Sequence, residues 1–171
     1  DIRMSSSSGG FATAIAKYFV ENKGSVCSCV FREGEFIFEF AETKEELFKF
    51  AGSKYVKSNP KGIYKQIKQQ ILAGREVLFI GLPCQVAALK SFITGKYQES
   101  LYTVDLICHG TPSPQHIKDF LLQYGYNVAE IKDISFRKKS TFGIEQNGNR
   151  VSMPGTYDRY TLAFLNGVNY T

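Results

Sequence analysis

Long apolar runs are missing from this sequence of 171 residues. None approaches the roughly 18 apolar residues that a membrane-spanning helix needs. A secretory signal is missing too, because serines and glycines occupy the opening, where such a signal would place an apolar stretch. These absences predict a cytoplasmic protein without a membrane span.

Clustered basic residues and a nucleic-acid-recognition motif are also absent. The net charge of +5 is mildly basic, and no long Lys/Arg run concentrates it. Either ordinary solvated lysines or a site for an anionic ligand such as a dinucleotide would explain this charge. We therefore expect a small-molecule partner and no nucleic acid.

Cysteine is scarce, and no Cys-x-x-Cys motif occurs among the four cysteines, which are Cys27, Cys29, Cys84 and Cys108. Without an export signal a disulfide framework is not expected, and the chain by itself shows no complete metal site. Cys27 and Cys29 lie two apart in a predicted strand and share one face with Phe31. We expect both to pack in the core.

Hydrophobic periodicity predicts helices and strands along most of the chain. In chain order, these are a helix over 11–22, a hairpin of strands over 26–31 and 36–40, a helix from 43, a helix over 59–73, a strand over 77–80, a helix over 86–93, a strand over 101–107, a helix over 113–124 and a strand over 131–136. Asn59 and Pro60 would begin the third helix. Residues 142–150 are typical of a loop or hairpin.

Buried strands that alternate with amphipathic helices indicate an α/β fold. We expect a mostly parallel or mixed sheet with helices on both faces, plus an N-terminal β-hairpin. The length suits one domain over residues 1–171, with the last ~30 residues irregular because periodicity weakens there. The chain begins at Asp1 instead of Met, which suggests a piece of a longer protein.

Two cysteines follow neighbouring predicted strands. Cys84 comes after the strand over 77–80, and Cys108 ends the strand over 101–107, directly before His109. In a parallel sheet both would lie at the carboxyl edge, where open α/β sheets bind ligands. Cys84 would also begin a helix, where free N–H groups favour thiolate. The alternative is that both cysteines are small buried hydrophobes.

Two further segments suit an anionic or planar ligand. The Ser/Gly stretch over 5–10 precedes a helix, and hydroxyls together with helix N–H groups bind anions. The loop over 52–55 offers a glycine, a hydroxyl, a cation and an aromatic ring. A linker would explain the first segment equally, and an ordinary surface loop would explain the second.

Taken together, five segments resemble the coenzyme F-420 hydrogenase/dehydrogenase beta subunit family. They are Arg3 with Ser6-Ser7-Ser8-Gly9-Gly10-Phe11, then Gly52-Ser53-Lys54-Tyr55-Val56 with Ser58, then Val77 to Val86 with Gly81-Leu82-Pro83-Cys84-Gln85, then Asp105-Leu106-Ile107-Cys108-His109-Gly110 with Ser113-Pro114, and Ile134-Ser135-Phe136-Arg137-Lys138-Lys139. The resemblance covers nearly the whole chain, and its Pro-Cys-Gln and Asp-x-x-Cys-His-Gly motifs are the most specific.

The resemblance implies a flavin and iron–sulfur oxidoreductase. Such proteins bind FAD and pass electrons between four-iron four-sulfur clusters, the flavin and a substrate such as a deazaflavin coenzyme. The implied partners are a ferredoxin-like domain or electron-transfer subunit and a small-molecule redox substrate. The implied site residues are Ser7, Ser8, Gly9 and Gly10 around the flavin pyrophosphate, Ser53, Lys54 and Tyr55 at the flavin or its phosphates, and Cys84, Cys108 and His109 beside the redox centre, with the two cysteines as candidate cluster ligands.

The sequence departs from the family pattern at both ends. The ferredoxin-like segment and the later cysteines of the family are not in it, so a complete cluster and independent activity are not expected of this chain. Two alternatives stay open. One is a cysteine-nucleophile enzyme that uses Cys84 and His109, and the other is a non-catalytic subunit of a polysaccharide-synthesis system.

Overall fold

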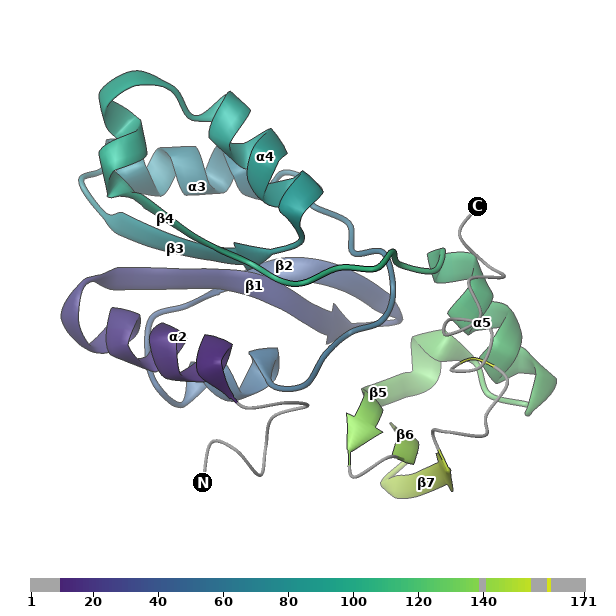
Figure 1. Ribbon diagram of the computed structural model, residues 1–171. Coiled ribbons are helices and arrows are strands. Elements are labelled where there is room, and N and C mark those ends of the chain that lie inside the picture. The colour runs from purple at the N-terminus through teal and green to yellow at the C-terminus, as the bar shows by residue number, and fades with distance from the viewer. Residues whose placement is uncertain (1–9, 139–140, 155–159, 161–171) are drawn as a thin grey trace.

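The computed structural model of the chain describes residues 10–138, 141–154 and 160, which form two sheets (Figure 1). The helices are α2 (Phe11–Asn22), α3 (Ile63–Leu72), α4 (Pro83–Phe92) and α5 (Pro114–Gln123), with 3₁₀ turns η1 (Glu46–Phe50), η2 (Gly95–Ser100) and η3 (Val128–Glu130). The strands are β1 (Gly24–Arg32), β2 (Glu35–Ala41), β3 (Glu76–Gly81), β4 (Leu101–Asp105), β5 (Ile131–Lys138), β6 (Thr141–Gln146) and β7 (Asn149–Pro154).

The first sheet is mixed and has the strand order β2-β1-β3-β4. Strands β1, β3 and β4 are parallel, whereas β2 pairs with β1 in an antiparallel hairpin. The hairpin turns through Glu33 and Gly34, whose φ angles of 48° and 79° match the turn that suits strand twist. The predicted hairpin is therefore confirmed, and its second strand, β2, is an edge strand of this sheet.

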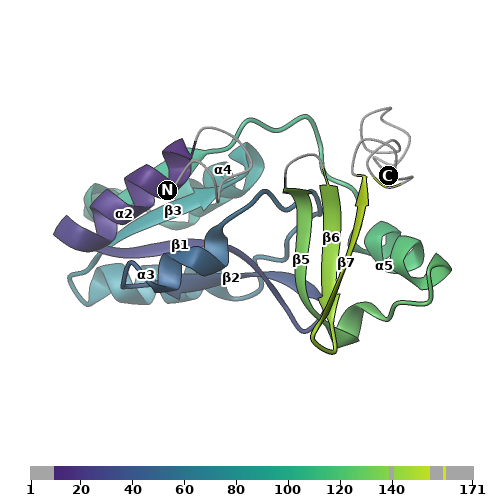
Figure 2. The ribbon, with the colours of Figure 1, turned by 90° about the horizontal axis from the view of Figure 1, so that it is seen from below.

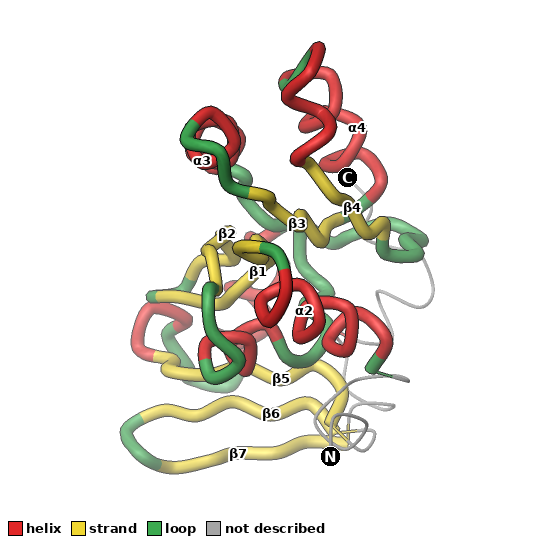
Figure 3. Tube along the Cα trace, turned by 90° about the vertical axis from the view of Figure 1, so that its left-hand side faces the viewer, coloured by secondary structure: helices red, strands yellow, loops and turns green. Residues whose placement is uncertain are grey.

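Helices cover both faces of the mixed sheet, as the view along the strands shows (Figure 3). Alternation along the strands sends neighbouring side chains to opposite faces. Val26 and Leu78 pack toward α2 and η1, whereas Cys27 and Phe79 pack toward α3 and α4. The predicted α/β class, with a mixed sheet and helices on both faces, is confirmed.

The second sheet corrects the expected place of the last predicted strand. Instead of extending the parallel sheet, β5 pairs antiparallel with β6, and β6 with β7, beside α5 (Figure 2). β6 and β7 form a hairpin through Asn147 and Gly148, both with positive φ, so the hairpin alternative for 142–150 is the observed one. Regular structure therefore continues to Pro154, beyond the point where irregular chain was expected.

An aromatic core joins the second sheet to α5. Phe120, Phe136 and Phe142 pack around Tyr160, with ring centroids 5.6–6.4 Å apart. Phe36 of the first sheet reaches this core and lies 5.9 Å from the Phe136 ring. The two sheets are therefore packed against each other through the turn end of the β1–β2 hairpin.

Two predicted element boundaries were wrong. Helix α3 begins at Ile63, after Gly62 with a φ of 74°. Asn59 lies before the helix, where its N–H donates to the Phe36 carbonyl at 2.7 Å and its Oδ1 accepts from the Lys61 N–H at 3.0 Å. Strand β4 ends at Asp105, not at 107, and the Ile107 side chain is 93% exposed. Local apolar character could not show that the strand pairing ends at Asp105 and that no core covers Ile107.

Among the helices in the described part of the chain, none combines the length and the apolar character that crossing a membrane requires.

The start of α5 gives a first test of the fold. The Ser113 hydroxyl accepts a hydrogen bond from the Gln115 N–H at 3.2 Å, and Pro114 follows at the first helical position. We expect Ser113→Ala to lower the free energy of unfolding by about 1 kcal/mol, measured by urea denaturation. Ser91→Ala, at an exposed serine within α4, is the control and should change it by less than about 0.5 kcal/mol. Equal losses would contradict a capping role.

Candidate functional site

The carboxyl edge of the parallel strands carries the two exposed cysteines. Gly81 and Asp105 form the last pair of the β3–β4 ladder, and the Leu106 N–H extends it by donating to the Gly81 carbonyl at 2.9 Å. Cys84 and Cys108 each lie three positions beyond that pair, and both are exposed. Their predicted location at one edge of the sheet is confirmed. That both thiols face one cleft stays a prediction.

Cys84 is the second residue of α4, where helix N–H groups have no partner within the helix. The Gln85 side chain folds back, and its Oε1 accepts a hydrogen bond from the Leu82 N–H at 3.0 Å. The Tyr64 hydroxyl donates to the Gln85 carbonyl at 3.1 Å. Burial raises the pKa of Tyr64, and electrostatic interaction with the nearby Cys84 raises it further. The turn that holds Cys84 is thus bonded on both sides of the cysteine.

Cys108 lies in the loop between β4 and α5. Its Sγ accepts a hydrogen bond from the Gly110 N–H at 3.3 Å, and Gly110 has a φ of 115°, which favours glycine. His109 is exposed next to it. Within the described residues, Cys84 and His109 form no hydrogen bond with each other. The two exposed thiols and the imidazole therefore share the edge without forming a nucleophile–base pair.

Cys27 and Cys29 occupy the sheet itself. Cys27 is fully buried against α3 and α4, which confirms its predicted core packing. Cys29 is half-buried and contacts the cores of both sheets. Burial raises the pKa of Cys29 to about 11, although Lys54 and a hydrogen bond with Ser58 act in the opposite direction. At neutral pH both thiols are therefore protonated and poorly reactive.

Lys54, the cation of the predicted ligand loop, is bonded to protein carbonyls. Its ammonium donates to the Phe50 and Ala51 carbonyls, each at 3.0 Å, and lies 3.5 Å from the Lys49 carbonyl. Burial lowers the pKa of Lys54, whereas Cys29 and Asp133 raise it. Because an ammonium has three donors, Lys54 can bond all three of these carbonyls at the C-terminal end of η1. A direct contact between Lys54 and a ligand phosphate stays a prediction.

The rest of this loop is anchored on the second sheet. The Tyr55 carbonyl accepts a hydrogen bond from the Tyr160 hydroxyl, and the Tyr55 ring meets Phe136 edge-on at 6.0 Å. Ser53 is exposed and follows Gly52, whose φ is 79°. The loop over 52–55 is therefore positioned between η1 and the aromatic core, with Ser53 open to solvent.

The start of α2 is the remaining predicted contact. Ser7, Ser8 and Gly9 lie outside the described residues. Gly10 is buried at the helix start with a φ of 81°, and its carbonyl accepts from the Ala14 N–H. No acidic side chain occupies the first turn, so the N–H groups there are compatible with an anion. Helix α2 runs back along β1, so its first turn points toward the carboxyl edge (Figure 1).

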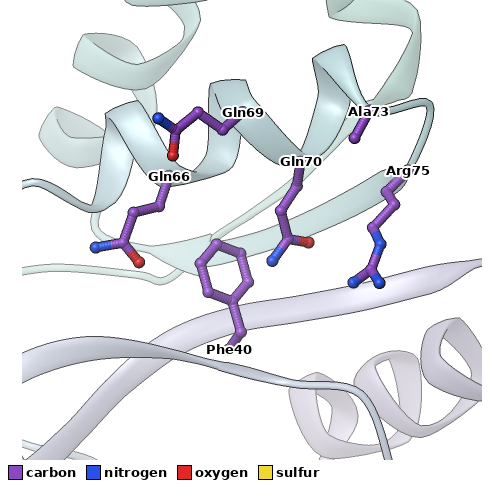
Figure 4. Close-up of a pocket in the computed structure, with 6 residues that line it drawn as sticks. All are labelled: Phe40, Gln66, Gln69, Gln70, Ala73 and Arg75. Carbon is purple, nitrogen blue, oxygen red and sulfur yellow. The ribbon is translucent and has the colours of Figure 1, made fainter.

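An open hollow of about 440 Å³ lies elsewhere on the molecule, beside the last turn of α3 (Figure 4). Its lining residues are Phe40, Gln66, Gln69, Gln70, Ala73 and Arg75. Arg75 precedes Glu76, which opens the β1–β3 ladder, so the hollow adjoins the amino edge of the parallel strands. Cys84 and Cys108 lie at the opposite edge. We therefore place the candidate site at the carboxyl edge.

A four-iron cluster does not fit the described residues by themselves. In the part of the chain that the structure describes, no group of three or more His, Cys, Asp or Glu side chains converges as a metal site. A cubane cluster generally takes four ligands, usually thiolates. Cys84 and Cys108 could supply at most part of that set.

Sequence reasoning assigned no role to Ser58 and Gln85, although both stand inside the motifs. The Gln85 Nε2 donates to the Ser58 Oγ at 3.0 Å, and both residues are buried. A signal for one half of this arrangement was present, because a glutamine at the third helical position commonly reaches back to the helix start. The Ser58 partner is 27 positions away, and no local pattern indicates it.

Proteins with an open α/β sheet form a class in which ligands commonly bind beyond the carboxyl ends of the strands, and this chain exposes Cys84 and Cys108 there. Within that class, two family models match this chain, and both describe the beta subunit of coenzyme F420 hydrogenase/dehydrogenase. The model of its C terminus matches residues 74–160, and the model of its N-terminal part matches residues 1–61. The chain therefore belongs to the coenzyme F420 hydrogenase/dehydrogenase beta subunit family. The predicted resemblance is confirmed, and it makes this a redox protein of the beta-subunit type.

A solved structure supports the fold. The chain is similar to one from the F420-reducing NiFe hydrogenase complex of Methanosarcina barkeri, studied by xenon derivatization, with a TM-score of 0.62 and 20% sequence identity. The match covers 90% of this chain and 56% of that one, so this chain spans little more than half of its neighbour's length. At this identity the likeness shows the fold alone. No curated protein matches the chain.

Proposed function

We propose that this chain is the flavin-binding part of an oxidoreductase that passes electrons between iron–sulfur clusters, FAD and a small-molecule substrate such as a deazaflavin coenzyme. The supporting observation is that Cys84 and Cys108 lie exposed beyond the last pair of the β3–β4 ladder, at the sheet edge where α/β proteins bind ligands. Family membership supplies the redox class.

The described residues fit the pyrophosphate of FAD at the start of α2. Gly10 has positive φ and carries no side chain, and no acidic side chain occupies the first turn, so the helix start is compatible with a bound anion. The first-turn N–H groups and the preceding Ser7, Ser8 and Gly9 would bind the phosphates. When bound, FAD would supply the hydride and electron chemistry, while the protein orients the flavin and tunes its potential.

The loop over 52–55 would shape the flavin site from a second side. Ser53 is an exposed residue and Tyr55 a half-buried one, while the Lys54 ammonium holds the loop through the carbonyls at the end of η1. Cys84, Cys108 and His109 would flank the redox centre from the strand ends. In this arrangement Lys54 acts on the ligand mainly by fixing the backbone between η1 and the second sheet.

The cluster ligands and the electron partner are part of the same proposal. Cys84 and Cys108 would supply two of the four thiolates, and the others would come from outside the described residues, in a ferredoxin-like domain or an electron-transfer subunit. The structural neighbour belongs to a hydrogenase complex, which is consistent with work alongside other subunits. No observation favours the cysteine-nucleophile alternative, since the described residues form no Cys84–His109 hydrogen bond, or the polysaccharide-synthesis alternative.

The spectrum of the intact protein, purified without oxygen, tests this proposal. We expect flavin absorption, stoichiometric FAD uptake in a fluorescence titration, and a broad iron–sulfur shoulder. Cys84→Ser should retain the flavin and lose electron transfer, because the thiol lies at the redox centre and not at the pyrophosphate. A colourless protein that takes up no FAD would overturn the flavin assignment.

Iron analysis separates the cluster part of the proposal from the flavin part. The 171-residue chain, reconstituted anaerobically, should bind well below the roughly four irons of a cubane cluster. About four irons per chain, lost in Cys84→Ser, would show that these residues carry a complete cluster.

A further inference from the structure

The three consecutive residues 57–59 form hydrogen bonds to the Cys108 loop, the Cys84 turn and the edge of the first sheet. The Lys57 N–H donates to the Pro112 carbonyl at 2.9 Å, in the loop that carries Cys108. The Asn59 N–H donates to the Phe36 carbonyl at the edge of the sheet. Between them, Ser58 turns inward to Gln85 in the turn that carries Cys84. The segment 57–59 therefore contacts the loops of both exposed cysteines.

Both ends of the Gln85 amide are hydrogen-bonded in this arrangement. Its oxygen accepts from the Leu82 N–H, and its nitrogen donates to the Ser58 hydroxyl, each at 3.0 Å. The side chain is only 9% exposed. A buried amide that loses one partner pays the full cost of an unsatisfied group, so the two hydrogen bonds support each other.

Gly81 shows how closely this turn is packed. A Cβ on Gly81 would lie 2.6 Å from the Phe79 ring and 3.2 Å from the Gln85 Oε1. The backbone at the end of β3 therefore leaves room for the Gln85 amide and for little else. Cys84 is exposed and lies between Leu82 and Gln85, which are joined by the hydrogen bond from the Leu82 N–H to the Gln85 side chain. The placement of the Cys84 thiol therefore depends on the hydrogen bonds of these two residues.

We propose that Ser58 and Gln85 are positioning residues that hold the Cys84 thiol in place at the carboxyl edge, with segment 57–59 as the common support for the Cys84 turn and the Cys108 loop. The importance of this placement rests on the proposed function, in which the two thiols flank the redox centre. The placement itself is a property of the protein chain alone.

A nitroxide probe on one thiol at a time tests the proposal. Cys84 is labelled in a Cys108→Ser background and Cys108 in a Cys84→Ser background. Cys27 is fully buried and the raised pKa of Cys29, about 11, keeps that thiol protonated, so neither competes at neutral pH. The measurement is the electron paramagnetic resonance line shape, which separates an ordered from a mobile probe.

Ser58→Val and Ser58→Thr form a matched pair, because valine and threonine have the same shape and differ in the hydroxyl. Ser58→Val should abolish the ordered component at Cys84, and Ser58→Thr should restore it. The Cys108 probe should be unchanged, because the Lys57–Pro112 hydrogen bond uses only backbone atoms. Gln85→Met, tested in parallel, should also abolish the ordered component at Cys84. It supplies an independent test if the added methyl group of the valine and threonine variants prevents folding.

Gln98→Met is the control for general loss of stability. Gln98 holds the other end of α4 by donating to the Ile93 carbonyl at 2.9 Å, and its replacement should leave the Cys84 probe ordered. An ordered Cys84 probe in both Ser58→Val and Gln85→Met would overturn the inference, as would equal loss of order in Gln98→Met. Because the probe needs no cofactor, failed FAD uptake with a mobilised Cys84 would sink the proposed function and leave this inference standing.

Discussion

Gly24→Ala is expected to destabilise the protein by about 3 kcal/mol or more. Gly24 opens the parallel pairing of β1 with β3, opposite Glu76. A Cβ at this position would lie 2.1 Å from the Glu76 carbonyl oxygen and 3.0 Å from its carbon. Because both are backbone atoms of the neighbouring strand β3, no side-chain rotation relieves the overlap, and the two strands must move apart.

Equilibrium unfolding in urea measures this effect, and Gly62→Ala is its control. Nothing lies within 4 Å of a Cβ on Gly62, but its φ is 74°, so the substitution should cost only the strain of a left-handed residue, about 1–2 kcal/mol. A Gly24→Ala protein no less stable than Gly62→Ala would show that the strands accommodate the methyl group. The pairing at the start of β3 would then be looser than the contacts indicate.

Lys54→Glu is expected to weaken FAD binding by about a hundredfold or more. The substitution places a carboxylate against the Phe50 and Ala51 carbonyls, where the ammonium now donates. An uncompensated charge in a partly buried site costs about 3–5 kcal/mol, and 1.4 kcal/mol corresponds to about tenfold in affinity. The loop over 52–55 should therefore detach from η1, and the flavin contacts of Ser53 and Tyr55 should be lost with it.

Lys54→Met separates support of the loop from direct phosphate contact. If Lys54 acts by closing η1, flavin affinity and hydrogen-exchange protection of residues 50–56 should fall together in both variants, further in Lys54→Glu. If the ammonium contacts a phosphate, Lys54→Met should lose affinity while exchange in the loop stays as in the unmodified protein. Unchanged affinity of Lys54→Glu in a fluorescence titration would remove Lys54 from the flavin site altogether.

The location of the candidate site was predictable because it depends on strand direction. Two apolar strands, each followed by a turn with cysteine and then a helix, place Cys84 and Cys108 at one edge once the strands are parallel. The pairing of Ser58 with Gln85 was not predictable, since it joins side chains 27 positions apart with no shared period. The role of Lys54 was missed for a different reason: its residue type suits a phosphate, whereas its ammonium donates to backbone carbonyls of the preceding turn, which no side-chain pattern reveals.

The sequence by itself determined the α/β class, the N-terminal hairpin, the helix over 113–124 and the family, because these depend on short patterns of apolar residues, turn residues and motifs. Only the tertiary structure decided that β5 leaves the parallel sheet for a second, antiparallel one, and that Asn59 pairs with the sheet edge instead of starting a helix. These outcomes depend on which distant partner a segment finds. A strand shows the same alternation of apolar and polar residues in either sheet. The free energy of packing its side chains against neighbouring strands determines which sheet it joins.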